Sequence, residues 1–288
     1  MMEIIRIPRI MQETSRHYIT KSKKLGFVPT MGALHEGHLS LVRRAKDEND
    51  LVVVSIFLNP KQFGANEDLS YYPKPIESDI EKLQSINTDI LFLPETSFIY
   101  PTNFCTYITV QNLSDKLCGP FRPGHFTGVT TVVCKLLNMV MPSRLYLGQK
   151  DYQQLLIIKR MVEDLNIPVE IIPCRTIREK DGLAMSSRNS YLKSKERLSA
   201  TVIYKTLSYL SNLIVEKKIP CHEVKGKMKE MLLNEPLIEE IQYASIYDPE
   251  TLDELDNYKK VNLLAVALKI GNTRLIDNMI VEINSVVV

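Results

Sequence analysis

The sequence predicts an α/β protein in which a doubly wound, Rossmann-like domain with a parallel sheet is followed by a smaller α+β domain with an antiparallel sheet. Three observations lead to this prediction. Apolar, strand-like runs alternate with helix-like stretches as far as Ile172. That alternation stops near Thr176. Beyond it come two helix-like stretches and three strand-like runs, the last two joined by a Gly271–Asn272 turn.

The first domain is expected to open with a helix that ends at the basic residues before Leu25. A short buried strand at residues 25–28 follows, and Pro29 is expected to end its ladder because proline has no N–H to donate. The apolar, β-branched run at residues 51–58 is typical of a central parallel strand covered on both faces. Further elements are expected at 76–84 (helix), 89–93 (strand), 145–147 (strand), 152–166 (helix) and 169–172 (strand).

The second domain is predicted to contain helices at residues 194–217 and 222–234. Its strands are expected at residues 242–247, 262–270 and 274–281. We therefore predict domains at residues 1–176 and 177–288. The chemistry is expected near their junction, because ligand sites favour domain boundaries.

Charge and composition exclude several classes of protein. The 36 basic and 34 acidic residues leave a formal charge of +2, which gives no electrostatic argument for a nucleic-acid partner or a membrane surface. No uncharged apolar stretch approaches the roughly 20 residues that span a bilayer, and charged residues interrupt the N-terminal stretch where a signal peptide would be apolar. The five cysteines are odd in number and form no C-x-x-C pair, which favours free thiols. We expect a cytoplasmic protein.

The stretch at residues 25–46 predicts a strand, a glycine-bearing turn and a helix. Gly32 and Gly37 mark places where the backbone turns tightly or approaches another group closely. His35 and His38 lie three residues apart, so both fall on one side of the first helical turn. Free N–H groups and the positive end of the helix dipole suit an anion such as phosphate. The imidazoles can donate hydrogen bonds or a proton as charge builds in a transition state.

Two other interpretations of the histidine pair stay open. A single histidine is more often structural than functional. The His-Glu-Gly-His order also suggests a zinc-binding helix, but that motif needs histidines four residues apart with two residues after the glutamate. This sequence is one residue short, and the preceding strand with Pro-Thr-Met-Gly favours a nucleotide instead.

Two later stretches also suit a nucleotide. Gly148-Gln149-Lys150-Asp151 follows an apolar strand and opens a helix, where Lys150 can reach a phosphate and Asp151 can bind ribose hydroxyls or a magnesium-bound water. The structural alternative is a capping Asp151 or a solvated lysine. Ser186-Ser187-Arg188 lies on a glycine-led loop and can clamp a phosphate. Its alternative is an ordinary pair of helix-capping serines.

The order of these motifs carries a resemblance to a known family. The signature of the pantothenate synthetase (pantoate–β-alanine ligase) family is similar to Pro29-Thr30-Met31-Gly32-Ala33-Leu34-His35-Glu36-Gly37-His38. Its His-x-Gly-His core is shared by the wider nucleotidyltransferase superfamily, which includes class I aminoacyl-tRNA synthetases, and the Ser-Ser-Arg loop resembles their KMSKS loop. The same family pattern is matched by Asn59-Pro60-Lys61-Gln62-Phe63, Arg122-Pro123-Gly124-His125-Phe126 and Arg274-Leu275-Ile276-Asp277-Asn278. The resemblance therefore runs through both predicted domains.

The resemblance implies an ATP-dependent ligase that joins pantoate to β-alanine through a pantoyl adenylate, releasing AMP and pyrophosphate. It assigns catalysis to His35, His38, Lys150 and Arg188. It assigns ATP binding to Met31, Gly32, Ala33, Leu34, His35, Glu36, Gly37, His38, Gly148, Gln149, Lys150, Asp151, Ile177, Met185, Ser186, Ser187 and Arg188. Pantoate binding falls to Gln62 and Gln154, with β-alanine also at Gln62. The resemblance further implies that Mg²⁺ bridges the phosphates and is held by Asp79 through water, and that the protein is a homodimer.

The sequence departs from the family pattern at two positions. Ser78 precedes Asp79 where the family often has two adjacent acidic residues, which weakens a two-carboxylate magnesium site. Gln149 stands where glutamate is common, which removes a charge beside Lys150.

Two rival functions remain at this point. A nucleotidyltransferase that passes AMP to a different acceptor is disfavoured by the Gln62 loop, by Gln154 and by the second domain. An inactive nucleotide-binding module is disfavoured by the complete set of His35, His38, Lys150 and the Ser-Ser-Arg loop.

Overall fold

The computed structural model describes residues 2–65 and 67–283, which form two compact units. The first unit comprises the chain up to residue 114 with residues 122–149 and 154–175. The second comprises residues 115–121, residues 150–153 and the chain from residue 176 onward. Two short early segments thus pack with the later part of the chain. The predicted domain limits, which assign both segments to the first domain, stay a prediction.

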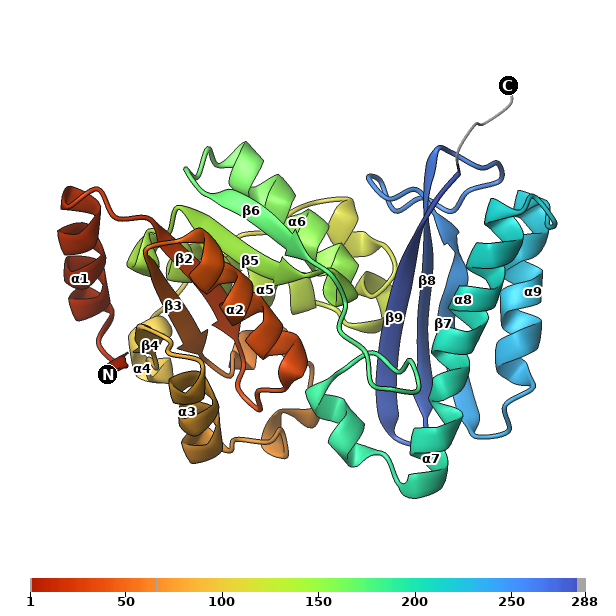
Figure 1. Ribbon diagram of the computed structural model, residues 1–288, viewed down its shortest axis with the longest axis horizontal. Helices are drawn as coiled ribbons and strands as arrows, with labels where there is room; N and C mark the ends of the chain where they lie inside the picture. The colour runs from red at the N-terminus through yellow and green to blue at the C-terminus, as the bar shows by residue number, and fades with distance from the viewer. Residues whose placement is uncertain (1, 66, 284–288) are drawn as a thin grey trace. The chain divides into compact units, whose positions relative to one another are not determined.

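Within the described residues, the first unit has a parallel sheet of six strands in the order β1-β4-β3-β2-β5-β6 (Figure 1). The strands are β1 Glu3–Ile5, β2 Leu25–Thr30, β3 Leu51–Ile56, β4 Ile90–Phe92, β5 Arg144–Gly148 and β6 Glu170–Cys174. From β2 the chain proceeds to one side of the sheet through β3 and β4, and later to the other side through β5 and β6. The order therefore reverses between β2 and β5, and open α/β sheets bind ligands at the carboxyl edge of such a point.

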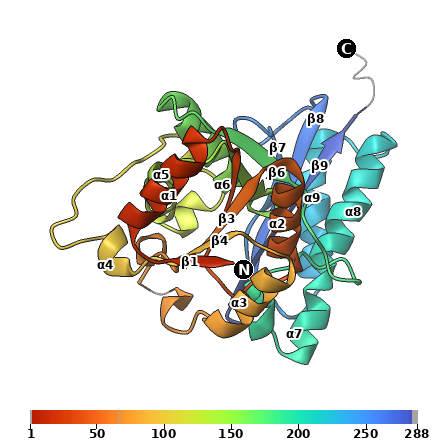
Figure 2. The same ribbon diagram turned by 60° about the vertical axis from the view of Figure 1, so that its left-hand side comes forward.

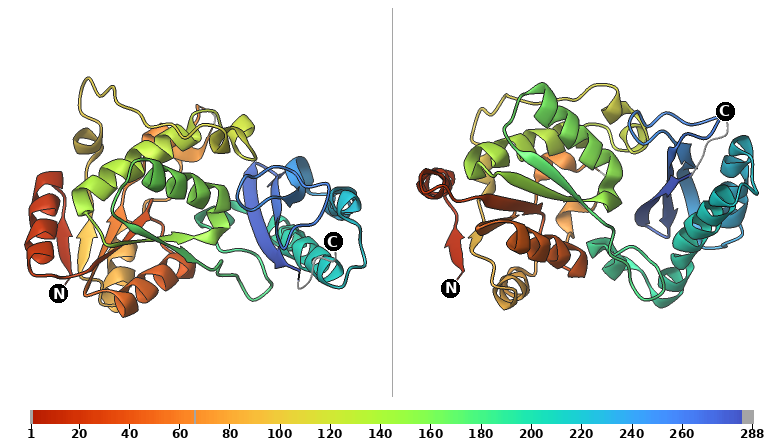
Figure 3. Two further views of the ribbon diagram at one scale, coloured as in Figure 1. Left: turned by 90° about the horizontal axis from the view of Figure 1, so that it is seen from above. Right: turned by 45° about the horizontal axis from the view of Figure 1, so that its top comes forward.

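Helices cover both faces of this sheet (Figure 3, left). The helices are α1 Pro8–Thr20, α2 Glu36–Glu48, α3 Ile76–Ser85, α4 Thr96–Ile99, α5 His125–Val140 and α6 Tyr152–Asp164. On one face, Val42 and Ala45 of α2 pack against Val28, Val52 and Val54 of the sheet, and all five are fully buried. Helices α1 and α5 lie on the opposite face. This doubly wound arrangement confirms the predicted class of the first domain.

One sequence prediction about this sheet is wrong, because β2 continues through Pro29 to Thr30. The Thr30 carbonyl accepts from the Phe57 N–H on the β3 side, at 3.0 Å. Backbone groups alternate sides along a strand, so the nitrogen of Pro29 faces the β5 side. There β5 pairs with β2 only at Gly26 and Phe27. The missing N–H therefore removes no ladder bond.

The second unit contains an antiparallel sheet in the order β7-β8-β9. Its strands are β7 Ile238–Tyr247, β8 Val261–Ile270 and β9 Thr273–Glu282, and its helices are α7 Ser194–Ser199, α8 Thr201–Val215 and α9 Cys221–Leu233. Helices α8 and α9 lie along this sheet (Figure 2) and share its apolar core. This arrangement confirms the predicted antiparallel α+β class. No helix in the described parts of the chain is long and apolar enough to cross a membrane.

The predicted helix at residues 194–217 is divided into α7 and α8 at Ala200. The Thr201 hydroxyl donates to the Leu198 carbonyl at 2.8 Å. Such local side-chain bonds to the backbone compete with a continuous helical ladder.

Candidate active site

The turn after β2 is a left-handed bend closed by a threonine. The Thr30 hydroxyl donates to the Ser55 carbonyl at 2.8 Å and accepts from the Gly32 N–H at 3.2 Å. Gly32 and Ala33 both have positive φ, +86° and +51°. Glycine adopts this region freely, but alanine does so at a cost. The bend therefore needs contacts from elsewhere to hold it.

Those contacts come from α3. The Asp79 carboxylate accepts from the Ala33 N–H and the Leu34 N–H, each at 2.8 Å, through different oxygens. Lys82, one turn further on, donates from Nζ to the Leu34 carbonyl at 2.8 Å. Burial raises the pKa of the Asp79 carboxyl, and the two amide donors and Lys82 act against that rise.

Asp79 does not fit the predicted magnesium site. Its side chain has no exposed surface, both oxygens accept from the turn, and the Lys82 ammonium lies 3.9 Å from one of them. Within residues 2–65 and 67–283, no cluster of three or more histidine, cysteine or acidic side chains is arranged to hold a metal ion. Asp79 therefore fits the role of an anchor for the turn. The sequence missed this role because its partners lie 45 and 46 positions away.

His35 and His38 cap α2 reciprocally. His35 is the N-cap residue, and its Nδ1 accepts from the Gly37 N–H at 3.1 Å. Nδ1 of His38 accepts from the His35 N–H at 3.4 Å. Because both Nδ1 atoms accept, each neutral ring carries its proton on Nε2. The ring centroids are 4.0 Å apart and the ring planes are tilted by 35°, so the two imidazoles pack against each other.

This geometry revises the expectation of free N–H groups at the helix start. The Gly37 N–H is taken by the His35 ring, and the His38 N–H bonds the His35 carbonyl at 2.8 Å. The Ala33 and Leu34 amides are bonded to Asp79. The donors that the two neutral histidine side chains contribute at this helix start are therefore their Nε2–H groups.

Gln62 lies in the loop after β3 and is mostly buried. Its Oε1 accepts from Asn59 Nδ2 at 3.0 Å, and its Nε2 donates to the Met31 sulfur at 2.9 Å. A thioether is a weak acceptor. A substrate oxygen can therefore replace it at little cost. The structure thus joins two of the predicted site residues, Gln62 and Met31, in one contact.

The backbone of Gln62 is held by residues that have no predicted role in the site. His125 Nδ1 lies 2.7 Å from the Gln62 carbonyl, and Arg122 NH1 lies 2.9 Å from His125 Nε2. Since Arg122 can only donate, His125 carries its proton on Nδ1 and donates to Gln62. Arg122 also pairs with Glu67 through two bonds, of 2.9 and 2.5 Å. The Arg-Pro-Gly-His-Phe motif gave a signal for Arg122 and His125, whereas nothing in the sequence marked Glu67.

The other predicted site residues of the first unit lie at the carboxyl end of β5 and just after it. Gly148 ends that strand, and a side chain added there would meet nothing within 4 Å. Gln149 opens the short turn Gln149–Asp151. Gln154 lies in the first turn of α6 and is partly buried. Gly148 therefore leaves open space at the carboxyl end of β5, beside the point where the strand order reverses.

The remaining predicted residues belong to the second unit. Lys150 accepts through its carbonyl from Asn278 Nδ2 at 2.8 Å. Ile177 and Met185 form the base of a hairpin, with the Met185 N–H bonded to the Ile177 carbonyl at 3.0 Å. Ser186 caps the following turn, Ser187–Tyr191, because its Oγ accepts from the Arg188 N–H at 3.3 Å. The structural alternative for Ser186, a capping serine, is thus realised in the fold.

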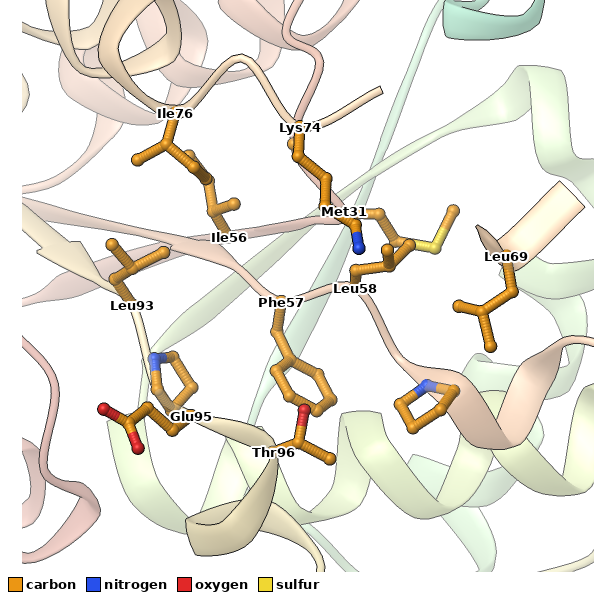
Figure 4. Close-up of a pocket in the computed structure, with 13 residues that line it drawn as sticks. Met31, Ile56, Phe57, Leu58, Leu69, Lys74, Ile76, Leu93, Glu95 and Thr96 are labelled. Carbon is orange, nitrogen blue, oxygen red and sulfur yellow. The ribbon is translucent and has the colours of Figure 1, made fainter. Parts of the chain in front are cut away.

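A cavity of about 560 Å³ adjoins the turn after β2 (Figure 4). Its walls are mainly apolar, with Phe57, Leu58 and Leu93 among them, and Lys74 turns towards Met31. Neither histidine nor Gln62 lines it. It therefore borders the histidine site only through Met31 and Gly32, and it does not define that site.

A doubly wound parallel sheet with a paired His-x-Gly-His helix start at the point where its strand order reverses places these residues where open α/β enzymes bind nucleotides and similar ligands. The Pantoate-beta-alanine ligase family model matches residues 3–280. The chain belongs to this family, and it is an enzyme that ligates pantoate and β-alanine with ATP.

Relatives and solved structures agree with this assignment. The pantothenate synthetase of Thermodesulfovibrio yellowstonii is 63% identical over 281 residues, covering 98% of this chain and 100% of the relative. A crystal structure of the Thermus thermophilus enzyme superimposes with a TM-score of 0.92 at 41% identity, covering 96% of this chain and 99% of that one. The Francisella tularensis ligase, complexed with β-γ ATP and β-alanine, has a TM-score of 0.78 at 37% identity and covers 97% of each chain.

Proposed function

We propose that the chain performs its ligation in two steps through a pantoyl adenylate. The pantoate carboxylate attacks the α-phosphorus of ATP in line, and pyrophosphate leaves. The amine of β-alanine then attacks the acyl carbon, loses a proton and displaces AMP. Neither step needs a protein nucleophile. Catalysis then consists of alignment and of stabilising the charge that develops on the phosphates.

The observation that carries this proposal is the reciprocal capping of the histidine pair, which sets the tautomer of each neutral ring. Both Nδ1 atoms are occupied by backbone donors, so each neutral ring has its N–H donor at Nε2. We assign His35 and His38 to the triphosphate, where such donors stabilise growing negative charge. By family resemblance, Lys150, Ser186, Ser187 and Arg188 are assigned to the phosphates. Met31, Gly148, Asp151 and Ile177 are assigned to the rest of the nucleotide.

Gln62 and Gln154 are proposed to bind pantoate and to select it as the acid substrate. Pantoate has a carboxylate and two hydroxyls, so its site needs donors and acceptors together. A glutamine amide supplies both without a charge. It can steady the carboxylate less tightly than an arginine would, which leaves that group able to attack phosphorus. Gln62 is further proposed to contact β-alanine.

Three assignments complete the proposal. Mg²⁺ is proposed to enter with ATP as part of the co-substrate, without ligation by Asp79. The homodimer is proposed from the family resemblance. A cytoplasmic location is supported by the five cysteines, all of which are free thiols.

ATP–pyrophosphate exchange tests the two-step reaction. Exchange of labelled pyrophosphate into ATP is expected when pantoate is present and β-alanine is omitted, because the adenylate forms before the amine enters. No exchange is expected without pantoate. Exchange that appears only when β-alanine is added would contradict the adenylate intermediate. Consumption of the adenylate should depend on the amine, which distinguishes a ligase from a bare adenylyltransferase.

A further inference from the structure

We propose that Asp79 and Lys82 of α3 act together as positioning residues that hold the turn between β2 and α2, and that neither coordinates Mg²⁺. Their effect on the reaction is exerted through His35 and His38, so this part rests on the proposed function of the histidines. The two side chains contact only the turn among the predicted site residues.

The backbone amides of the turn form an anion-binding site that is occupied by a side chain of the protein itself. Gly32 and Ala33 are successive left-handed residues. Successive backbone N–H groups in such bends converge and can hold an anion. The Asp79 carboxylate is that anion, with one oxygen on the Ala33 N–H and the other on the Leu34 N–H. The contact holds a backbone conformation that a non-glycine residue at position 33 would otherwise avoid.

Lys82 extends this hold to the histidines through a single peptide group. The Leu34 carbonyl, which accepts from Lys82 Nζ at 2.8 Å, shares its peptide bond with the His35 N–H. That N–H donates to Nδ1 of His38. One rigid, planar unit is therefore bonded to Lys82 at its oxygen and to the His38 ring at its nitrogen. Rotation of this peptide would withdraw the donor that orients His38.

The same contacts argue against a metal at Asp79. A divalent cation there would lie beside the Lys82 ammonium, which is 3.9 Å from the carboxylate. Like charges at such a distance repel. The carboxylate is also fully buried and already accepts from two donors. Lys82 supplies the positive charge that the carboxylate needs.

The decisive variant is Asp79→Asn. The amide keeps the shape of the carboxylate but turns one of its two acceptors into a donor that faces a backbone N–H. We expect kcat to fall by about tenfold to a hundredfold, because small misplacements of aligned groups cost rates of that order. The KM for ATP and the Mg²⁺ concentration that gives half-maximal rate should stay close to wild type. Amide hydrogen exchange at Ala33 and Leu34 should become faster.

Asp89 provides a matched control in the same unit. Its carboxylate also accepts from one backbone N–H (Val52, 2.8 Å) and from one lysine (Lys46, 3.0 Å), but it lies at the amino ends of the strands. Asp89→Asn should lower thermal stability while kcat and the exchange of Ala33 and Leu34 stay unchanged. Lys82→Met is the second test variant, which keeps the apolar stem and should lower kcat without changing the Mg²⁺ dependence. It also replaces Asp79→Asn if that protein does not fold.

The outcomes distinguish the anchoring of the turn by Asp79 and Lys82 from the catalytic role proposed for the histidines. A raised Mg²⁺ requirement in Asp79→Asn, absent in Asp89→Asn, would overturn the proposal by making Asp79 a metal ligand. If Asp79→Asn had a wild-type kcat and wild-type amide exchange at Ala33 and Leu34, Asp79 would not anchor the turn. A third outcome is faster amide exchange in Asp79→Asn together with a normal kcat in both Asp79→Asn and His38→Ala. It would support the anchoring of the turn by Asp79 and overturn the proposed function of the histidines.

Discussion

The turn that carries the histidines and the hairpin that carries the Ser-Ser-Arg loop are both held by a buried aspartate, but at different places. Asp79 bonds the backbone of the turn directly, one residue before His35. Asp277 instead pairs with the Arg178 side chain through bonds of 2.6 and 3.1 Å, near the base of its hairpin. The first arrangement fixes the peptide groups next to His35. The second fixes the hairpin base, eight residues before Ser186.

This difference gives the two segments that we propose to contact phosphate two different kinds of organisation. The histidine turn is organised before any ligand arrives, which suits groups that must meet charge in a transition state. The hairpin leads from a firmly held base to a partly exposed Ser-Ser-Arg segment, which suits an element that orders on nucleotide binding.

The largest effect is expected for His38→Ala. Removing a preorganised donor that meets transition-state charge typically costs on the order of a hundredfold in kcat. Because the turn is already in place without ATP, the affinity for ATP should change far less. Steady-state kinetics measure both values. A near-normal kcat with a raised KM for ATP would assign His38 to ground-state binding.

Gln154→Glu should weaken the binding of pantoate and leave ATP binding unchanged. The substitution keeps the shape but replaces a donating amide by a negative charge near the pantoate carboxylate. A repulsion of about 1.4 kcal/mol, small for two charges in a partly buried site, raises KM for pantoate about tenfold. Gln84→Glu, an exposed position on α3, is the control and should match wild type. If Gln154→Glu and Gln62→Glu both bind pantoate normally, the assignment of the glutamines is wrong.

Gly32 and Gly182, two of the glycines with positive φ, should differ in how much they tolerate a side chain. Gly32→Ala adds a methyl group 3.1 Å from Ile56 and 3.2 Å from Asp79, in a conformation that costs an L-residue about 1–2 kcal/mol. Gly182→Ala adds the same strain, and its Cβ would lie 2.0 Å from the Tyr204 ring. Thermal unfolding should therefore show the larger loss of stability for Gly182→Ala. Gly226 lies in α9 with open space around it, so Gly226→Ala should raise the free energy of unfolding by about 1 kcal/mol. Equal losses at Gly32 and Gly182 would contradict the packing argument.

The sequence predicted those parts of the fold whose cause is local. The run at residues 51–58 is apolar and β-branched, and it forms the central strand β3. The spacing of His35 and His38 placed both rings on one helix start, as the structure confirms. Helix α5 was missed, because most of its residues are buried and its Val- and Thr-rich sequence lacks a polar face. The three-residue edge strand β1 is too short to give a pattern.

The contacts that organise the candidate site could not be predicted in this way. Asp79 bonds residues that precede it by 45 and 46 positions, and Arg122 reaches Glu67 across 55 positions. Such partners are brought together only by the order of strands in the sheet. A family resemblance marks Asp79 as a residue of interest, but its role depends on which atoms meet it. Both carboxylate oxygens face amides of the turn, and this geometry favours an anchor over a metal ligand.

Amide hydrogen exchange with and without a non-hydrolysable ATP analogue tests the comparison most directly. Exchange at Ala33 and Leu34 should be slow in the free protein and change little when the analogue binds, because Asp79 already holds both amides. Exchange at residues 185–189 should be faster in the free protein and slow markedly with the analogue. Equal exchange at residues 185–189 in both states would contradict an ordering loop. Slowing confined to Ala33 and Leu34 would contradict the preorganised turn.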